Sequence, residues 1–328
     1  MRYSSRYLLR RVGFALLTIF LAATADFLLP RLMGGNPAQA LASSTALGSP
    51  AAAAAIAREF GLSNPNWGVQ YLHYLWQLLH GNLGISYEYY PASVASVLFQ
   101  ALPYTVALVL SSTVISFLVG WTLGVIGAWR RGSWVDQAGV GIAFWLYALP
   151  YFWLAMLLVF VFAFELGWFP MGHALPSSIT GLTAWQWISG AIVHGILPVG
   201  SLVLTSTAGH LLLMRNNMLN VLSEDYMQLA RAKGLSPWKM MVRYAARSAL
   251  LPSFTGLMLS LGTVVGGALV TEIVFSYPGI GLATYNAILS HDYPMIQGAF
   301  LILALAVVAM NFLADLLYPL LDPRVNLQ

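Results

Sequence analysis

The residues of this chain that could do chemistry of their own are few and widely separated. Among its 328 residues there are 11 Asp and Glu, six His and no Cys. The lack of cysteine excludes a disulfide framework, thiolate metal ligands and a cysteine nucleophile. The sequence contains no H-E-x-x-H or G-x-S-x-G pattern, which argues against a zinc protease or a serine hydrolase. We therefore predict no catalytic, metal-binding or cofactor-binding residues in this chain.

One basic stretch, residues 223–251, instead has the spacing of a docking element. Ser223 is a good N-cap, acids follow in the first turn, and cations stand near the last turn, as the helix dipole favours. Gly234 lies where a left-handed residue ends a helix, and Ser236-Pro237 then starts a second one. The charged residues concerned are Glu224, Asp225, Arg231 and Lys233. The pattern predicts a helix over Glu224–Lys233, a sharp turn and a second helix, which together form a rigid knob.

The composition places this knob beside a membrane. The chain is 59% hydrophobic and 8% charged, with a mean hydropathy of +0.74. Soluble domains carry about 25% charged residues, whereas a bilayer span needs about 20 apolar ones. We therefore predict an all-α integral membrane protein with six transmembrane helices. The expected spans are Val12–Leu32, Leu102–Trp129, Val135–Phe164, Ile188–Met214, Leu250–Phe275 and Ile296–Leu320.

The basic residues orient these spans. In the six-span arrangement 13 of the 15 Lys and Arg lie on one side, and only Arg31 and Arg58 lie on the other. The positive-inside rule makes the basic side cytoplasmic, so both termini are expected inside a multi-pass protein of the cell (inner, cytoplasmic) membrane. This distribution explains the net charge of +4 by orientation, without nucleic acid as a partner. Ala23-Thr24-Ala25 resembles a signal-peptide cleavage site, but the apolar run continues beyond it, so we expect the first span to be kept.

Three domains follow from this arrangement. Residues 1–32 form a cytoplasmic N-terminal segment with the first span, and residues 33–100 form a small extracytoplasmic helical cap. The cap is expected to contain helices over Ala51–Phe60 and Trp67–Leu79. Residues 101–328 form a five-span core that carries a cytoplasmic loop, residues 214–249, between spans 4 and 5.

Few polar side chains lie within the spans. Asp26 and Asp315 are expected near opposite membrane faces, where both can be hydrated, so structural roles are favoured. His194 and His210 lie sixteen residues apart without a third ligand nearby, so helix packing is favoured over metal binding. Glu272, near the outer end of the fifth span, is the most suggestive acid. A gating role and a structural role at the adjacent turn are equally open for it.

The knob and a series of shorter motifs resemble a known family. Ala230-Arg231-Ala232-Lys233-Gly234, with Pro252 eighteen residues after the glycine, resembles the coupling loop of binding-protein-dependent ABC importer permeases, most closely the dipeptide/oligopeptide branch. The other motifs occur in the order typical of that branch. They are Tyr7-Leu8-Leu9-Arg10-Arg11, Gly35-Asn36-Pro37-Ala38, Gly81-Asn82-Leu83-Gly84, Leu102-Pro103, Phe152-Trp153-Leu154, Leu166-Gly167-Trp168-Phe169-Pro170, Thr271-Glu272, Tyr277-Pro278-Gly279-Ile280-Gly281, Asp292-Tyr293-Pro294 and Leu321-Asp322-Pro323-Arg324.

The resemblance implies a set of partners. Two homologous permease subunits would form the path, two cytoplasmic ATP-binding subunits would carry ATP and Mg²⁺, and an extracellular solute-binding protein would deliver the solute. The resemblance also implies the ATPase contact and an outer gate. The contact residues would be Glu224, Asp225, Gln228, Ala230, Arg231, Lys233 and Gly234, and the gate candidates are Glu272, Tyr277, Pro278 and Gly279. Gln228 departs from the glutamate common in the wider class, which puts in doubt a salt bridge at this position.

The chain has no G-x-x-x-x-G-K-[ST] motif, so ATP hydrolysis is expected on other subunits and the chain itself is not predicted to be an enzyme. Small peptides are the favoured solute, with oligosaccharides, nickel or glutathione as alternatives. A secondary transporter driven by an ion gradient is a more distant alternative, because it would need paired acids or broken helices at the midplane.

Overall fold

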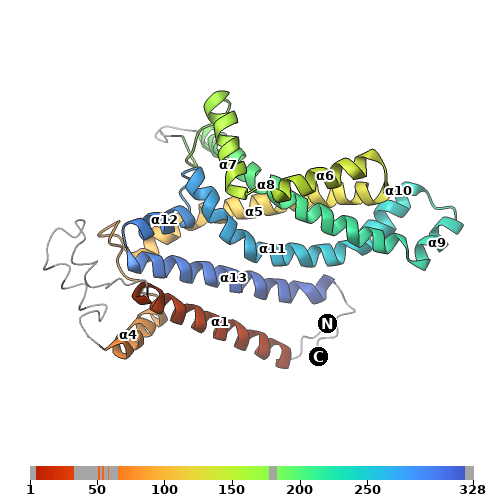
Figure 1. Cartoon of the computed structure of the whole chain (residues 1–328). Helices are drawn as coiled ribbons and strands as arrows, with labels where there is room; N and C mark the ends of the chain where they lie inside the picture. Colours follow the sequence, from red (N-terminus) through yellow and green to blue (C-terminus); the bar gives the residue numbers. More distant parts are fainter. Residues whose placement is uncertain are drawn as a thin grey trace. The chain divides into compact units, whose positions relative to one another are not determined.

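A computed structural model describes residues 5–32, 66–176 and 183–321, together with Ala51, Ala54 and Arg58. The predicted all-α fold is confirmed: the described residues form helices, and their only extended pairing is an isolated bridge between Ile85 and Ser93 (Figure 1). The elements, in chain order, are α1 (Ser5–Leu32), α4 (Trp67–Leu79), α5 (Val94–Trp129), α6 (Trp134–Ala148), α7 (Tyr151–Leu158), the π-helical η2 (Val159–Glu165), α8 (Ala184–Leu222), α9 (Asp225–Ala232), α10 (Pro237–Lys239), the π-helical η3 (Met240–Ala246), α11 (Arg247–Val274), α12 (Ile280–Leu289) and α13 (Tyr293–Leu321).

Several of these helices can cross a bilayer. By length and composition α1, α5, α8 and α13 qualify, and the bent pair of α6 with α7 and η2 would be a fifth span. Helix α11 occupies the place of the expected span Leu250–Phe275. The predicted number of six spans stays a prediction, and so do the limits of the three predicted domains. The expected helix Ala51–Phe60 lies outside the described residues, apart from three of its positions.

Most expected spans begin earlier than the sequence predicts. Helix α8 starts four residues before Ile188, because Thr183 and Gln186 form a reciprocal capping box. Helix α5 starts at Val94 rather than Leu102, and its first turns pack in a core with α12 and α13. Pro103 lies inside α5 without ending it. Packing and capping beyond the most apolar segments therefore decide where these helices begin.

The expected third span, Val135–Phe164, is not one straight helix. Its chain breaks at Leu149-Pro150, and the axes of the two halves differ by 99°. Proline disfavours helical backbone in the residue before it, and Leu149 accordingly adopts an extended conformation (φ −78°, ψ 134°). The expected span thus contains a sharp bend at Pro150, which the sequence analysis did not predict.

The chain folds as two compact units. The first contains the described residues up to Thr105 and those from Pro278 to Phe312, and the second contains Val106 to Tyr277 with the last part of α13. In the first unit, the core consists of apolar side chains of α5, α12 and α13, among them Val94, Leu98, Ile280 and Met295. The Thr105 hydroxyl accepts a hydrogen bond from the Ile280 amide (2.9 Å), which fixes the start of α12 against α5.

Asp26 belongs to the first unit and is 6% exposed, so the expected hydration of this carboxyl was wrong. Its backbone carbonyl accepts a hydrogen bond from the Gln297 side chain at 3.0 Å, which joins α1 to α13. The tertiary packing of α1 therefore removes from water an acid whose sequence position is near a helix end. The side chain of Asp315 lies outside the described residues.

A buried carboxylate organises the loop before α5. Asp292 is fully buried at the start of α13, and it accepts hydrogen bonds from the Ser86 hydroxyl and from the amides of Tyr87 (2.8 Å), Glu88 (3.0 Å) and Met295 (3.1 Å). Burial raises the pKa of the Asp292 carboxyl above its ordinary value, although these hydrogen bonds oppose the rise. One side chain thus satisfies three consecutive residues of a loop some 200 positions earlier in the chain.

The second unit is built on α8, which packs against α6, α7 and α11. Helices α5 and α8 approach closely at Gly124, where an added Cβ would lie 2.8 Å from the Met214 Cβ. Such small residues allow membrane helices to pack backbone against backbone. Pro198 in α8 and Pro252 in α11 are accommodated within continuous helices, as expected where neighbouring helices and side chains can satisfy the freed carbonyls.

Replacing Asp292 with alanine should destabilise the protein by about 3 kcal/mol, because several buried donors would lose their acceptor at once. The change should appear as a lower midpoint of thermal unfolding in detergent. The matched control is Glu88→Ala, since the Glu88 side chain is exposed and only its amide contacts Asp292. That control should stay within about 0.5 kcal/mol of the parent. Equal effects of the two substitutions would contradict the assigned role of Asp292.

Candidate coupling site

The knob predicted from the sequence begins one residue later than expected. Ser223 ends α8 in a helical conformation, and its hydroxyl donates to the Asn220 carbonyl at 2.6 Å. The N-cap position of α9 is occupied by Glu224, whose backbone is extended (φ −71°, ψ 148°) and whose side chain makes no capping bond. The prediction of Ser223 as the N-cap was therefore wrong, because its hydroxyl bonds back into α8.

The end of α9 follows the predicted turn chemistry. Gly234 has φ +67°, its amide donates to the Arg231 carbonyl (3.0 Å), and the Leu235 amide donates to the Ala230 carbonyl (3.3 Å). These two bonds form a Schellman motif, which satisfies the last carbonyls of the helix. The left-handed conformation predicted for Gly234 is thus confirmed. Ser236 then precedes α10, in which Pro237 is the first helical residue, as also predicted.

The inner face of α9 attaches the knob to the second unit. Met227 and Ala230 are 0% and 3% exposed, and they lie three residues apart on one face of the helix. They pack in a cluster with Met214 and Met218 of α8 and with alanines of η3 and α11. Ala230 was expected at the ATPase contact, but its side chain faces its own protein. Its place in the motif is a matter of packing, because a larger side chain would separate α9 from the rest of the cluster.

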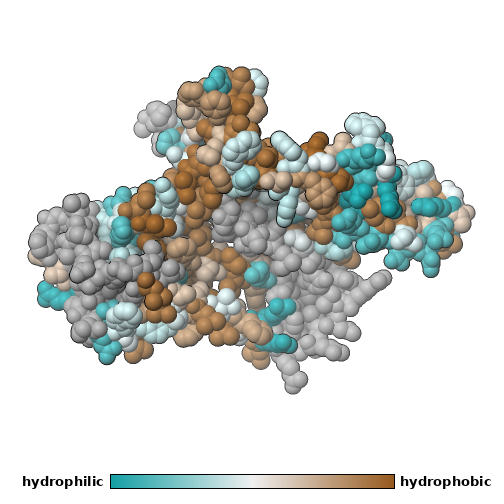
Figure 2. Space-filling model, viewed as in Figure 1, coloured by the Kyte–Doolittle hydropathy of each residue, from teal (hydrophilic) through white to brown (hydrophobic). Residues whose placement is uncertain are grey.

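The outer face of α9 is open. All the other predicted contact residues are exposed: Glu224, Asp225, Gln228, Arg231, Lys233 and Gly234. Among them stand large apolar side chains that the sequence reading missed, namely Tyr226 (40% exposed), Leu229 (55%) and Trp238 (71%). Figure 2 shows hydrophilic residues gathered at the end of the second unit that carries α9 and α10. An exposed surface of apolar side chains rimmed by both signs of charge is typical of a protein-binding site.

A partly buried ion pair, which the sequence analysis did not predict, braces this end of the unit. Arg215 of α8 donates from Nε and Nη2 to the two carboxylate oxygens of Asp136 on α6, at 2.6 and 2.9 Å. Asp136 is 4% exposed and also accepts the Gly132 amide at 3.0 Å. Bidentate pairs of this kind fix orientation as well as distance. The pairing ties the α5–α6 turn to α8 one residue from Met214, which is part of the cluster under the knob.

The four gate candidates are divided between the two units. Glu272 is fully buried in α11, and its carbonyl accepts the Tyr277 amide at 2.8 Å within the second unit. Pro278 and Gly279 belong to the first unit, where Gly279 precedes α12 as its N-cap residue. The gating role of these residues stays a prediction.

The two histidines have separate surroundings in the second unit. The Nδ1 of His194 lies 2.9 Å from the Gly172 carbonyl, and since a carbonyl only accepts, Nδ1 is the donor. His210 packs edge-on against the Phe117 ring, with 5.6 Å between the centroids. Both arrangements agree with the favoured packing role. Within the part of the chain that the structure describes, no three His, Asp or Glu residues gather in a way that could hold a metal ion.

Comparison with known proteins adds a family and several relatives. The family model described as "Binding-protein-dependent transport system inner membrane component" matches residues 120–327. The chain is 33% identical to the dipeptide transport system permease protein DppB of Escherichia coli over 98% of both chains. It is 35% identical to the probable peptide ABC transporter permease protein of Sinorhizobium fredii, over 98% of this chain and 99% of the relative. It is 36% identical to a putative peptide transport system permease protein of Brucella suis, over 97% and 98%.

Substitution of Gly234 should destabilise the turn after α9. The loss should be larger for residues that adopt the left-handed conformation at a higher free-energy cost. No atom lies within 4 Å of an added Cβ, so the effect is conformational and not a clash. We expect Gly234→Val to cost about 1–2 kcal/mol and Gly234→Asn clearly less, since asparagine tolerates this conformation. Hydrogen exchange of residues 230–240 measures the effect, with Gly139→Ala in α6 as a control that leaves this exchange unchanged. Equal exchange in the Val and Asn variants would contradict the explanation.

Removal of Arg215 should destabilise the second unit, because the buried Asp136 carboxylate would lose its bidentate partner and keep only the weaker attraction of Arg131. We expect Arg215→Ala to cost about 3–5 kcal/mol, visible as a lower unfolding midpoint in detergent. The double variant Asp136→Ala/Arg215→Ala should be less destabilised than the sum of the single variants, since no unpaired charge remains. Arg231→Ala, which removes an exposed cation of α9, is the control and should have little effect. Additive losses in the double variant would show that the two residues act independently.

Proposed function

Since the chain belongs to the family of binding-protein-dependent transport system inner membrane components, we propose that it is a membrane-spanning permease subunit of an ATP-driven importer of small peptides. The observation that carries the proposal is identity of 33–36% to dipeptide and peptide transport permeases over nearly the whole of both chains. Three relatives that are named as dipeptide or peptide transport permeases support this solute class over oligosaccharides. The proposal accounts for a multi-pass apolar chain in which we find no P-loop.

The proposed partners supply the functions for which this chain has no motif of its own. ATP and Mg²⁺ are bound by two cytoplasmic ATPase subunits, because the chain itself offers no Walker motif for them. A second, homologous permease subunit completes the path, and an extracellular solute-binding protein supplies the peptide. The basic loop that contains α9 faces the cytoplasm together with both termini, according to the positive-inside distribution.

The outer face of α9 and α10 is proposed to be the ATPase contact. Leu229, Tyr226 and Trp238 offer apolar side chains for a groove, and the charges at the two ends of α9 rim them. The acids stand at the positive end of the α9 dipole and the cations at its negative end, so the charges within Glu224–Lys233 balance and each end of the dipole is compensated. Binding then depends on shape and on apolar burial, with the charges setting orientation.

The packing under the knob supports a mechanical role. The buried cluster joins α9 to the end of α8, to η3 and to the start of α11. A displacement of the knob is therefore passed to α8 and α11, the helices that precede and follow the loop, because a close-packed cluster transmits strain instead of absorbing it. We propose that closure of the ATPases moves residues 224–240 and tilts these two helices, which opens the path alternately to each side.

The test of the function is purification of the chain from its native membrane in a mild detergent, followed by identification of the co-purifying proteins and by uptake measurements. Recovery of two P-loop ATPases, a second permease and a solute-binding protein is the expected result, with uptake of labelled di- and oligopeptides that stops when ATP is depleted. Uptake that continues without ATP while an ion gradient is intact would overturn the importer. ATP-driven uptake of oligosaccharides without peptides would overturn the solute class alone.

Leu229→Asp should reduce ATPase co-purification at least about tenfold, since a charge would be buried in the proposed contact. The substitution should leave the unfolding midpoint unchanged, because Leu229 is 55% exposed in the chain itself. Met171→Asp, at a 60% exposed methionine of the segment between η2 and α8, is the matched control and should retain the ATPase. Normal ATPase recovery and peptide uptake with Leu229→Asp would place the contact elsewhere.

A further inference from the structure

Helix α4 of the first unit has an unusual distribution of side chains. Its exposed residues other than Gly68 are all apolar, and four of them recur at intervals of three and four residues, which aligns them on one face. This stripe consists of Val69 (46% exposed), Leu72 (68%), Trp76 (62%) and Leu79 (82%). Trp67 (55%) continues the apolar surface at the first turn of the helix.

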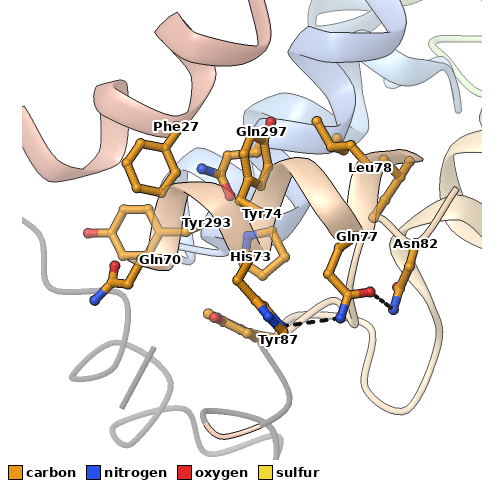
Figure 3. Close-up of a pocket in the computed structure, with 13 residues that line it drawn as sticks. Phe27, Gln70, His73, Tyr74, Gln77, Leu78, Asn82, Tyr87, Tyr293 and Gln297 are labelled. Atoms are coloured by element: carbon orange, nitrogen blue, oxygen red, sulfur yellow. Dashed lines mark hydrogen bonds between the residues drawn. The ribbon is translucent and has the colours of Figure 1, made fainter. Parts of the chain in front are cut away.

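The polar side chains of α4 point the other way. Gln70, His73 and Gln77 are half-buried and line a small cavity of about 60 Å³. Gln297 of α13 and Asn82 line it as well. Figure 3 shows Gln77 between Asn82 and His73. Its Oε1 accepts a hydrogen bond from Asn82 Nδ2 at 2.8 Å, and its Nε2 donates one to His73 Nε2 at 3.3 Å. Two polar side chains of this helix, His73 and Gln77, are thus hydrogen-bonded inside the unit.

This arrangement is the reverse of a helix on a water-soluble surface, which turns its apolar stripe inward and its polar residues outward. A contiguous exposed apolar stripe marks contact with another molecule or with a membrane. With its polar side chains turned toward the cavity, the helix presents only apolar side chains and Gly68 at its exposed face. Such a face is better matched by apolar surroundings than by water.

The position of α4 against α1 selects the bilayer as those surroundings. Tyr71 bonds to the Thr24 hydroxyl (2.7 Å), and the Phe27 ring lies 5.1 Å from the Tyr71 ring and 5.6 Å from the Tyr74 ring. At 1.5 Å per residue these contacts lie about 8–12 Å from the end of α1 at Leu32. With the Leu32 end of α1 at the membrane surface, that distance corresponds to the boundary between headgroups and acyl chains, where amphipathic helices and tryptophans are found.

The length of α4 and its neighbour agree with this location. Thirteen residues span about 20 Å, which is too short to cross a hydrocarbon core of about 30 Å. The adjoining α1 is a candidate span with exposed apolar side chains along its length, among them Leu17, Phe20 and Leu21. The stripe of α4 thus belongs to the same helix pair as the exposed apolar side chains of a candidate span.

We propose that α4 is an interfacial membrane helix, which embeds Val69, Leu72, Trp76 and Leu79 in the lipid of the leaflet around the Leu32 end of α1. The sequence predicts that residues 33–100 form an extracytoplasmic cap. In this proposal, α4 within that segment is instead part of the lipid-facing surface. The inference does not depend on the solute or on the ATPase contact proposed above, because it rests on α1, α4 and α13 alone.

The test uses the natural absence of cysteine from the chain. Single variants Leu72→Cys, Gln77→Cys and Glu88→Cys of the full-length protein, with its co-purifying subunits, are spin-labelled in liposomes of phosphatidylcholine and phosphatidylglycerol. Collision rates are measured with oxygen, which concentrates in the bilayer, and with a nickel chelate, which stays in water. Leu17→Cys on α1 is the lipid-facing reference, and the exposed Glu88 position is the aqueous one.

The expected ratio of oxygen to nickel collisions at Leu72→Cys is within about twofold of that at Leu17→Cys and at least about fivefold above that at Glu88→Cys. Gln77→Cys should be less accessible to both reagents than Leu72→Cys. A ratio at Leu72→Cys equal to that at Glu88→Cys would show that the stripe faces water and would overturn the proposal. Low accessibility to both reagents would also overturn it, and cross-linking to residues 33–65 or to another subunit would then identify the protein cover. Trp76→Cys and Leu79→Cys repeat the measurement on the same surface.

Discussion

Wherever a helix ends, backbone amides and carbonyls lose their intrahelical partners, and in the described part of this chain specific local devices satisfy several of them. The Schellman bonds at Gly234 satisfy the carbonyls that α9 would otherwise leave open. Asp292 receives the amides of Tyr87 and Glu88 in a loop that has only one isolated bridge of its own. At the break, Leu149 has the extended backbone that a following proline favours, and Pro150, which has no amide hydrogen, leaves no donor to be satisfied. The irregular segments are therefore as determined as the helices.

Contacts with neighbouring elements explain how the short helix α9 can act as a rigid element. An isolated helix of eight residues is not stable in water. Here α9 is held by two buried side chains, by its terminal turn and by a cluster that continues into α8, η3 and α11. The ion pair between Arg215 and Asp136 braces the adjoining turn at the level of this cluster. A force applied to the exposed face of α9 would therefore act on whole helices instead of a flexible loop.

The two units each contain a short amphipathic helix, and the two helices bury opposite kinds of face. Helix α9 follows the rule of a water-exposed helix, with methionine and alanine inward and charges outward. Helix α4 reverses it, with amides and imidazole inward and leucine and tryptophan outward. Both helices are short, and both were expected from the sequence to lie in water on opposite sides of the membrane. Their different environments are decided by which face finds partners within its own unit.

The sequence by itself determined the all-α membrane class, the bounds of α4, the glycine turn after α9 and the family, because these depend on local composition, capping and motif order. It did not determine the burial of Asp26 or the pairing of Arg215 with Asp136, since each requires knowing which distant helix lies alongside. The break at Leu149 has a local cause, the proline that follows it, but its angle of 99° comes from the structure alone. Nor did it separate Ala230, which faces inward, from Leu229 and Trp238, which face outward. Periodicity shows that a helix has two faces, but only the tertiary structure, through the partners that pack against one of them, decides which face is left for water, lipid or another protein.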